Sequence, residues 1–264
     1  WNHYQQYRDI EFARKMYESM IVPAANFMVN YRDPVLGLPL PSYDLWEERL
    51  GIHTFTVGSI YAGLQAAANF ATVFGDAKLA TSYREAALHY KALTLKYLWS
   101  EEKGRFYRCI NFNPVTQEIK TDDTVDISGP FALFFFEMLA PDDPKIVSNM
   151  ECVQDKLWVK TDVGGIARYQ NDYYHQISKD TDTIPGNPWI VCTMWLCQWH
   201  ILKAQTLLDL EPALKLLDWV THLALPSGLL AEQFNPYTGE SISVAPLTWS
   251  HASFASTVVL YLNK

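Results

Sequence analysis

The sequence lacks the features that mark several large classes of protein. Its four cysteines form no CxxC pair, no Asn-x-Ser/Thr sequon occurs, and no apolar run is long enough to cross a membrane. Basic residues never cluster and the net charge is -8, so nucleic acid and anionic membranes are poor partners. The four cysteines are also too few and too scattered to indicate a disulfide framework. Unpaired cysteines favour the cytoplasm, and the sequence carries no signal for an oligomeric state.

Motifs of metal and cofactor chemistry are missing as well. The seven histidines are scattered, with no HExxH and no zinc spacing, and no GxSxG, P-loop or GxGxxG occurs. Asp122, Asp123 and Asp126 form an acidic turn without the spacing of a calcium loop, and we expect a solvated or helix-capping role for them. The sequence therefore predicts no metal and no cofactor.

Aromatic and apolar residues, in contrast, are plentiful. The 264 residues are 49% hydrophobic and include nine tryptophans and fifteen tyrosines. That is enough for a substantial core, and the length suits one large domain or two small ones. Aromatic rings bury area in a core, and they also suit the flat apolar faces of sugars. Composition alone leaves both interpretations open.

Apolar helical stretches alternate with amphipathic ones along the chain. The apolar helices are expected at residues 53–74, 126–139, 187–206 and 249–262. The amphipathic helices are expected at residues 4–21, 77–98, 144–156 and 211–223. Asn187 is the expected N-cap of the third apolar helix, with Pro188 at its first position.

This alternation predicts an inner layer of helices enclosed by an outer layer. The expected fold is all-α, an (α/α)6 toroid, with an ordinary multi-helix bundle as the alternative. One β-hairpin is expected, from residues 104–112 with a turn at Asn113-Pro114. A closed ring of six inner and six outer helices needs twelve, whereas about eight are predicted. We therefore expect residues 1–264 to form one domain, an incomplete ring that lacks its N-terminal side.

Two adjacent glutamates in the stretch PSYDLWEERLGIHT, residues 41–54, raise the first question of function. Glu47 and Glu48 follow Trp46 at what looks like the start of a helix, where the helix dipole favours negative charge. A carboxyl group beside a large indole also loses water, which lets it keep a proton near neutrality. Glu232 lies in an apolar, turn-rich loop far along the chain. Two such carboxyl groups can cleave a glycosidic bond, one as acid and one as base.

Five segments in order resemble the glucoamylase-like catalytic domain of glycoside hydrolase family 15. They are YDLWEERLGIHTFT (43–56), GGIARYQNDYY (164–174), GNPWIVCT (186–193), GLLAEQFNPYTGE (228–240) and PLTWSHASF (246–254). The resemblance implies an (α/α)6 barrel that removes glucose from the non-reducing ends of α-glucans with inversion. It implies an oligo- or polysaccharide α-glucan as partner.

The same resemblance implies roles for single residues. Glu47 is expected to be the general acid, and Glu232 the general base that holds the attacking water. Ser243 is expected to support that base. The expected substrate-binding residues are Trp46, Glu48, Arg168, Asp172, Trp189, Ser243 and Trp249.

Three alternatives stay open from the sequence. Related family members cleave α-1,4, α-1,6 or trehalose linkages with the same acid and base, so a trehalase is one. A non-catalytic glucan-binding or regulatory domain, similar to that of the phosphorylase kinase α and β subunits, is another. The third is that the protein is secreted rather than cytoplasmic, as many polysaccharide-degrading relatives are.

Overall fold

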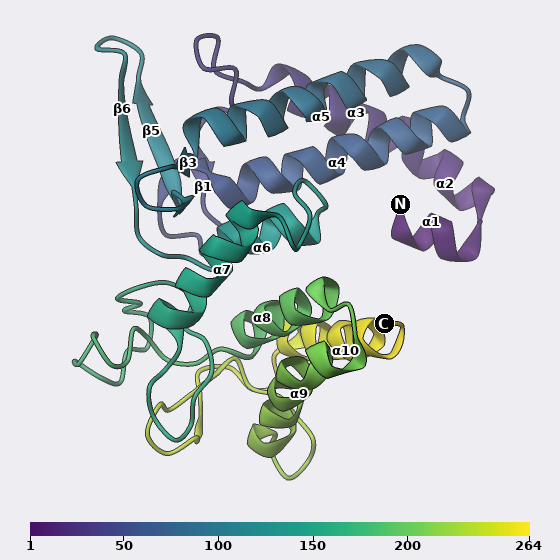
Figure 1. Cartoon of the computed structure of the whole chain (residues 1–264). Coiled ribbons are helices and arrows are strands. Elements are labelled where there is room, and N and C mark those ends of the chain that lie inside the picture. Colours follow the sequence, from purple (N-terminus) through teal and green to yellow (C-terminus); the bar gives the residue numbers. More distant parts are fainter.

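The computed structural model describes all residues from 1 to 264 and consists mainly of helices (Figure 1). The α-helices are α1 (Asn2–Tyr7), α2 (Ile10–Met16), α3 (Val22–Asn30), α4 (Thr54–Val73), α5 (Ala77–Tyr97), α6 (Ser128–Phe135), α7 (Pro144–Leu157), α8 (Ile190–Lys203), α9 (Glu211–Leu223) and α10 (Thr248–Leu262). A π-helix, η1 (Tyr17–Ile21), joins α2 to α3, and a 3₁₀-helix, η2 (Leu207–Leu210), precedes α9.

Short strands connect several of these helices. They are β1 (Ser42–Tyr43), β2 (Leu50–His53), β3 (Trp99–Ser100), β4 (Arg105–Phe106), β5 (Cys109–Asn113), β6 (Glu118–Asp122), β7 (Gln233–Phe234) and β8 (Ser241–Ile242). Four of them form one antiparallel sheet in the order β1-β2-β5-β6. The other two pairs, β3-β4 and β7-β8, are separate two-stranded ribbons.

The helices form the two layers that the sequence predicts. In the inner layer, α4 packs against α6, α6 against α8, and α8 against α10. In the outer layer, α5, α7 and α9 each pack on the inner helix that precedes them in the chain. The alternation of apolar and amphipathic stretches is therefore confirmed as an alternation of inner and outer helices.

The burial of each layer follows from its sequence. Almost every side chain of α8 between Ile190 and Ile201 is buried, including Cys192 and Cys197. In α7, by contrast, only one stripe faces the core, made by Ile146, Met150, Val153 and Leu157 together with Asn149. A spacing of three and four residues places such side chains on one face of a helix.

Several boundaries differ from the predictions. Residues 4–21 are not one helix, because Arg8 takes a left-handed conformation (φ 55°) that ends α1, and the side chain of Asp9 caps α2. The third inner helix begins at Ile190, with Trp189 rather than Asn187 at its N-cap. Asn187 instead donates its side-chain amide to the carbonyl of His175 and to Oε1 of Gln233. The 126–139 prediction was also too long at both ends.

The predicted hairpin is confirmed as β5 and β6, which pair from Cys109↔Asp122 to Asn113↔Glu118. Its first strand is shorter than the expected 104–112, because residues 105–106 form β4, which pairs with β3 instead. The rest of the sheet was not predicted. Ile52 of β2 pairs with Ile110 of β5, and this pairing brings the stretch 41–54 beside the hairpin. Strands of two to four residues carry too few side chains to show a period of two in the sequence.

The long connections 158–189 and 224–247 gather at one end of the helices, at the lower left of Figure 1. The two chain termini lie toward the opposite end. None of the helices combines the length and the apolar character that crossing a bilayer requires. The loop end of this scaffold is where a site is expected.

The contact between α4 and α6 gives a first testable prediction. A Cβ atom at Gly58 would lie 2.9 Å from the Cβ of Ala132 and 3.3 Å from its carbonyl carbon, so the helices would have to separate. We expect Gly58→Ala to lower the free energy of unfolding by about 1–3 kcal/mol, as overpacking does. Urea unfolding measures this change.

Gly63 of the same helix provides the matched control. A Cβ there would meet the flexible end of Met28 at 3.1 Å, and a methionine side chain can move aside. Because alanine favours a helix over glycine, Gly63→Ala should leave stability unchanged or raise it by up to about 1 kcal/mol. Equal stability of the two variants would contradict the close contact.

Candidate active site

The turn between β1 and β2 carries the two adjacent glutamates. The side chain of Asp44 is buried, and its Oδ1 accepts hydrogen bonds from the backbone N–H of Glu48 (2.8 Å) and of Arg49 (3.3 Å). Glu47 has a left-handed backbone with φ 60°. The expectation of a helix start is therefore wrong, since α4 begins only at Thr54 and the glutamates lie in a hairpin turn.

The two glutamates have different surroundings within this turn. Glu47 is exposed, and the loss of water that Trp46 was expected to cause is absent in this structure. The side chain of Glu48 is only 11% exposed and forms an ion pair with Arg168 (Nη2 to Oε1, 2.9 Å). Arg49 adds a second ion pair to its other oxygen at 2.8 Å. Only Glu48 is held in place by charge.

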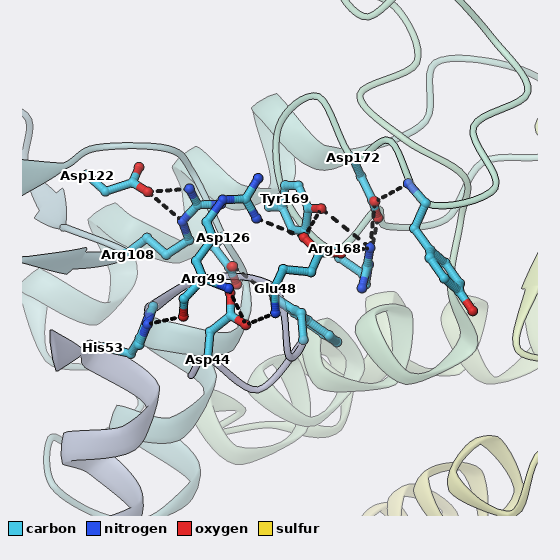
Figure 2. Close-up of polar contacts among 12 residues, drawn as sticks. Asp44, Glu48, Arg49, His53, Arg108, Asp122, Asp126, Arg168, Tyr169 and Asp172 are labelled. Atoms are coloured by element: carbon cyan, nitrogen blue, oxygen red, sulfur yellow. Dashed lines mark hydrogen bonds and ion pairs between the residues drawn. The ribbon is translucent and has the colours of Figure 1, made fainter. Parts of the chain in front are cut away.

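Arg168 is the centre of this charged cluster (Figure 2). Its side chain is 4% exposed, and that of Asp172 is fully buried. Nε and Nη2 of Arg168 donate to the two carboxylate oxygens of Asp172, each at 2.7 Å. The backbone N–H of Tyr174 also donates to Asp172, at 3.0 Å. A two-pronged pair of this kind fixes the orientation of the guanidinium.

Tyr169 joins the cluster, although the sequence analysis did not select it. Its hydroxyl donates to Oε2 of Glu48 at 2.5 Å. The guanidinium carbons of Arg49, Arg108 and Arg168 lie 4.9, 5.4 and 5.1 Å from the centre of its ring. The sequence offered one signal for its role, namely its position directly after Arg168 in the stretch RYQND (168–172).

The cluster favours the charged form of Glu48. Burial by itself would raise the pKa of Glu48, but the hydrogen bond from Tyr169 and the charge of Arg168 outweigh it, so that pKa lies below its ordinary value of 4.5. Burial, and after it the hydrogen bond to Glu48, raises the pKa of Tyr169. Burial by itself would lower the pKa of Arg168, but the hydrogen bonds to Asp172 and its negative charge raise that pKa above its ordinary value. A carboxyl group that is held ionised cannot serve as a proton donor near neutrality.

Four tryptophans pack beside this cluster. The ring of Trp46 lies 6.2 Å from that of Trp189, 5.9 Å from Trp195 and 6.2 Å from Trp249, measured between ring centres. Three of them are buried, whereas Trp249 is 37% exposed. Of the three tryptophans predicted to bind sugar, Trp249 alone therefore presents a large exposed face. Trp195 was missed because it lies within an apolar helical run typical of core residues.

Glu232 lies immediately before β7 and is half-buried. Its Oε2 accepts hydrogen bonds from the hydroxyl of Ser243 and from Nε2 of Gln233, the latter at 3.0 Å. Gln233 is itself held by Nδ2 of Asn187, which donates to its Oε1 at 2.8 Å. Ser243 has a left-handed backbone, φ 64°. Two donors thus fix the orientation of the Glu232 carboxylate.

Backbone bridges, a hydrogen bond and ring contacts bring the five segments of the resemblance together. Ile166 pairs with Trp189, and Trp189 pairs with Gln233. Ser250 of α10 donates its hydroxyl to the carbonyl of Ala231 at 2.8 Å. The segments of Glu47 and Glu232 are linked through the tryptophans, since Trp46 lies beside Trp189, which pairs with Gln233.

The site contains no group of three or more His, Cys, Asp or Glu side chains close enough to hold a metal ion, and neither does the remainder of the structure. The polar side chains of the site are carboxylates, arginines, hydroxyls and amides. Such a set can bind hydroxyl groups and exchange protons with them.

Comparisons with a family model and with known proteins agree on one family. A sequence model of glycosyl hydrolases family 15 matches residues 38–210 and 211–259. The chain is 29% identical over 261 residues to an uncharacterised glycosyl hydrolase of Methanocaldococcus jannaschii, covering 96% of this chain and 38% of that protein. It is 28% identical over 269 residues to a glucoamylase of a Clostridium species, covering 93% of this chain and 36% of that protein.

The fold agrees with this family. The structure of a bacterial glucoamylase in complex with acarbose matches with a TM-score of 0.77 and 22% identity, over 94% of this chain and 38% of that chain. This likeness confirms the predicted (α/α)6 toroidal fold. The chain spans less than two-fifths of the length of these three proteins.

The buried ion pair predicts a strong dependence of stability on Asp172. In Asp172→Asn the guanidinium of Arg168 stays buried but keeps only one of its two negatively charged partners, Glu48. We expect the free energy of unfolding to fall by about 3 kcal/mol. The matched control is Asp123→Asn. The side chain of Asp123 is 53% exposed, so its pairs with Lys103 and Arg105 (3.3 and 3.8 Å) should contribute less than about 1 kcal/mol. Similar losses in both variants would contradict the role of burial.

The lowered pKa of Glu48 predicts how stability depends on pH. A glutamate with a lower pKa in the folded state stabilises the protein above its ordinary value of 4.5, and this contribution is lost as the pH falls through the lowered pKa. We expect Glu48→Gln to cost about 2 kcal/mol at pH 7. The difference between Glu48→Gln and wild type should shrink as urea titrations move below pH 4.5. A difference that stays constant down to pH 3 would refute the shift.

Proposed function

Because the chain belongs to glycosyl hydrolases family 15, we propose that it is the catalytic part of an exo-acting, inverting glycoside hydrolase. It releases glucose from the non-reducing ends of α-glucans. The observation that carries this proposal is that the segments of two glutamates meet at one tryptophan cluster. Glu47 directly follows Trp46, and Glu232 directly precedes Gln233, whose backbone pairs with Trp189.

The surroundings of the two carboxylates suit different tasks. Glu47 is exposed and is free of the ion pairs that hold Glu48 ionised, so Glu47 is the better candidate for the general acid. It donates a proton to the glycosidic oxygen as the bond to the anomeric carbon breaks. Glu232, oriented by Ser243 and Gln233, removes a proton from the attacking water.

Inversion follows from a water placed between the base and the sugar. The water attacks the anomeric carbon from the side opposite the leaving oxygen, so an α-linked glucose is released as β-glucose. This route needs the carboxyl groups of Glu47 and Glu232 roughly 6.5–9.5 Å apart, whereas a covalent route with retention needs about 5 Å.

The charged cluster then supplies the binding of sugar hydroxyls. Arg168 uses Nε and Nη2 within the protein, which leaves Nη1 for a ligand. The ionised Glu48 accepts hydrogen bonds from hydroxyls, and Asp172 holds Arg168 in place for them. The exposed face of Trp249 provides a flat apolar surface for a sugar ring.

Glucose release tests the proposal. The substrates are maltose, isomaltose, maltoheptaose and trehalose, and NMR identifies the anomer that is formed first. We expect β-glucose from at least one substrate. Glu47→Gln and Glu232→Gln should each lower kcat by about 100- to 10,000-fold, which is the usual contribution of a general acid or base.

Glu240→Gln is the matched control, because Glu240 is an exposed glutamate of the same 228–240 loop, and this change should leave kcat unaltered. Fresh α-glucose would refute inversion. Release from trehalose alone would favour a trehalase. An absence of release from all four substrates, with glucan binding retained, would favour a non-catalytic binding domain.

A further inference from the structure

Asp126 is a buried carboxylate outside the predicted set of site residues. Of the two expected roles, solvated or helix-capping, the solvated one is wrong, because only 5% of Asp126 is exposed. Asp126 lies one residue before Ile127, the N-cap of α6. Its Oδ1 accepts hydrogen bonds from the backbone N–H of Ser128 (2.8 Å) and from the Ser128 hydroxyl (2.6 Å). Its Oδ2 accepts the indole N–H of Trp46 at 3.0 Å.

The backbone around Asp126 lies against the segment that carries Arg168. Asp126 and Tyr169 form a bridge of antiparallel pairing. The N–H of Ile127 donates to the carbonyl of Arg168 at 3.2 Å. One residue therefore contacts the charged cluster through its backbone and Trp46 through its side chain.

Trp46 connects this contact to both parts of the site. It directly precedes Glu47 in the chain, and the guanidinium carbon of Arg168 lies 5.1 Å from the centre of its ring. Its indole N–H is directed to Asp126. A tilt of the ring would therefore move the turn that carries Glu47 and the surface against which Arg168 packs.

We propose that Asp126 is a positioning residue for the proposed hydrolysis: by accepting the Trp46 indole N–H it holds Glu47 and Arg168 in their working positions. Asp126 itself does not touch the substrate. This inference rests on the proposed function, since it names a residue that supports the same site.

The groups around position 126 favour a carboxylate there. All three groups that face its oxygens are donors, from Ser128 and Trp46. Burial raises the pKa of Asp126, and the hydrogen bonds from Ser128 and Trp46 oppose that rise. An amide of the same size would turn an NH₂ toward one of the donors. With its oxygen on Ser128, an asparagine would direct that NH₂ at the indole N–H.

The first test is the exchange of the Trp46 indole proton with solvent, followed by NMR of the ¹⁵N-labelled chain. We expect Asp126→Asn to speed this exchange at least about tenfold, because the proton loses its acceptor. The matched control is Asp143→Asn. Asp143 accepts the N–H two residues on at the start of α7 (2.8 Å), as Asp126 does at the start of α6, but it has no tryptophan partner. The Asp143→Asn exchange rate should equal that of wild type.

The second test is a double-mutant cycle on glucose release. We expect Asp126→Asn to lower kcat by about 10- to 100-fold, the effect of a catalytic group displaced by about 1 Å, with KM changed less. In a Trp46→Phe background, which lacks the indole N–H, adding Asp126→Asn should lower kcat by less than about twofold. Ser128→Ala is the second variant if Asp126→Asn fails to fold, and it should show the same changes at smaller size.

The outcomes separate the two hypotheses. Unchanged indole exchange, or a full loss of kcat that persists in the Trp46→Phe background, would overturn the positioning role. A wild-type protein that releases no glucose would refute the proposed function, and the exchange experiment would still decide whether Asp126 holds Trp46.

Discussion

The site depends on the burial of one positive charge, the guanidinium of Arg168. A charge taken out of water must be matched by partners of opposite charge and by hydrogen bonds. Asp172 and Glu48 supply both. Four aromatic rings complete the enclosure at 4.9–5.1 Å from the guanidinium carbon: Trp46, Tyr169, Tyr174 and Trp189. Aromatic faces are electron-rich, so they favour the cation that they surround.

This one requirement explains why the adjacent glutamates differ. Glu48 turns inward to meet Arg168, and the turn that allows it leaves Glu47 exposed with a left-handed backbone. A non-glycine residue in that conformation costs about 1–3 kcal/mol and persists only where its surroundings hold it. Ser243, beside Glu232, has the same conformation. Both proposed catalytic carboxylates therefore lie at or next to a position of backbone strain, as is common at functional sites.

The helices provide the rigid frame for these loops. The inner helices begin at the loop end of the ring, and backbone bridges such as Ile166↔Trp189 and Trp189↔Gln233 join one loop to the next. Asp126, at the start of α6, adds a side-chain link from the frame to Trp46. The site is thus held by pairing between loops as well as by the scaffold.

The helices whose signals are local could be predicted from the sequence. The bounds of α4, α5, α7, α9 and α10 follow from periodic apolar residues and from caps such as Asp76 and Asp143, and these patterns act within a few residues. The resemblance of five short segments also identified the family. Three contacts of the site could be seen only in the folded chain. Glu48 faces inward to Arg168, Asp126 accepts a hydrogen bond from a tryptophan 80 positions away, and Tyr169 reaches Glu48 across 121 positions. These contacts depend on how distant segments pack, and no local preference encodes them.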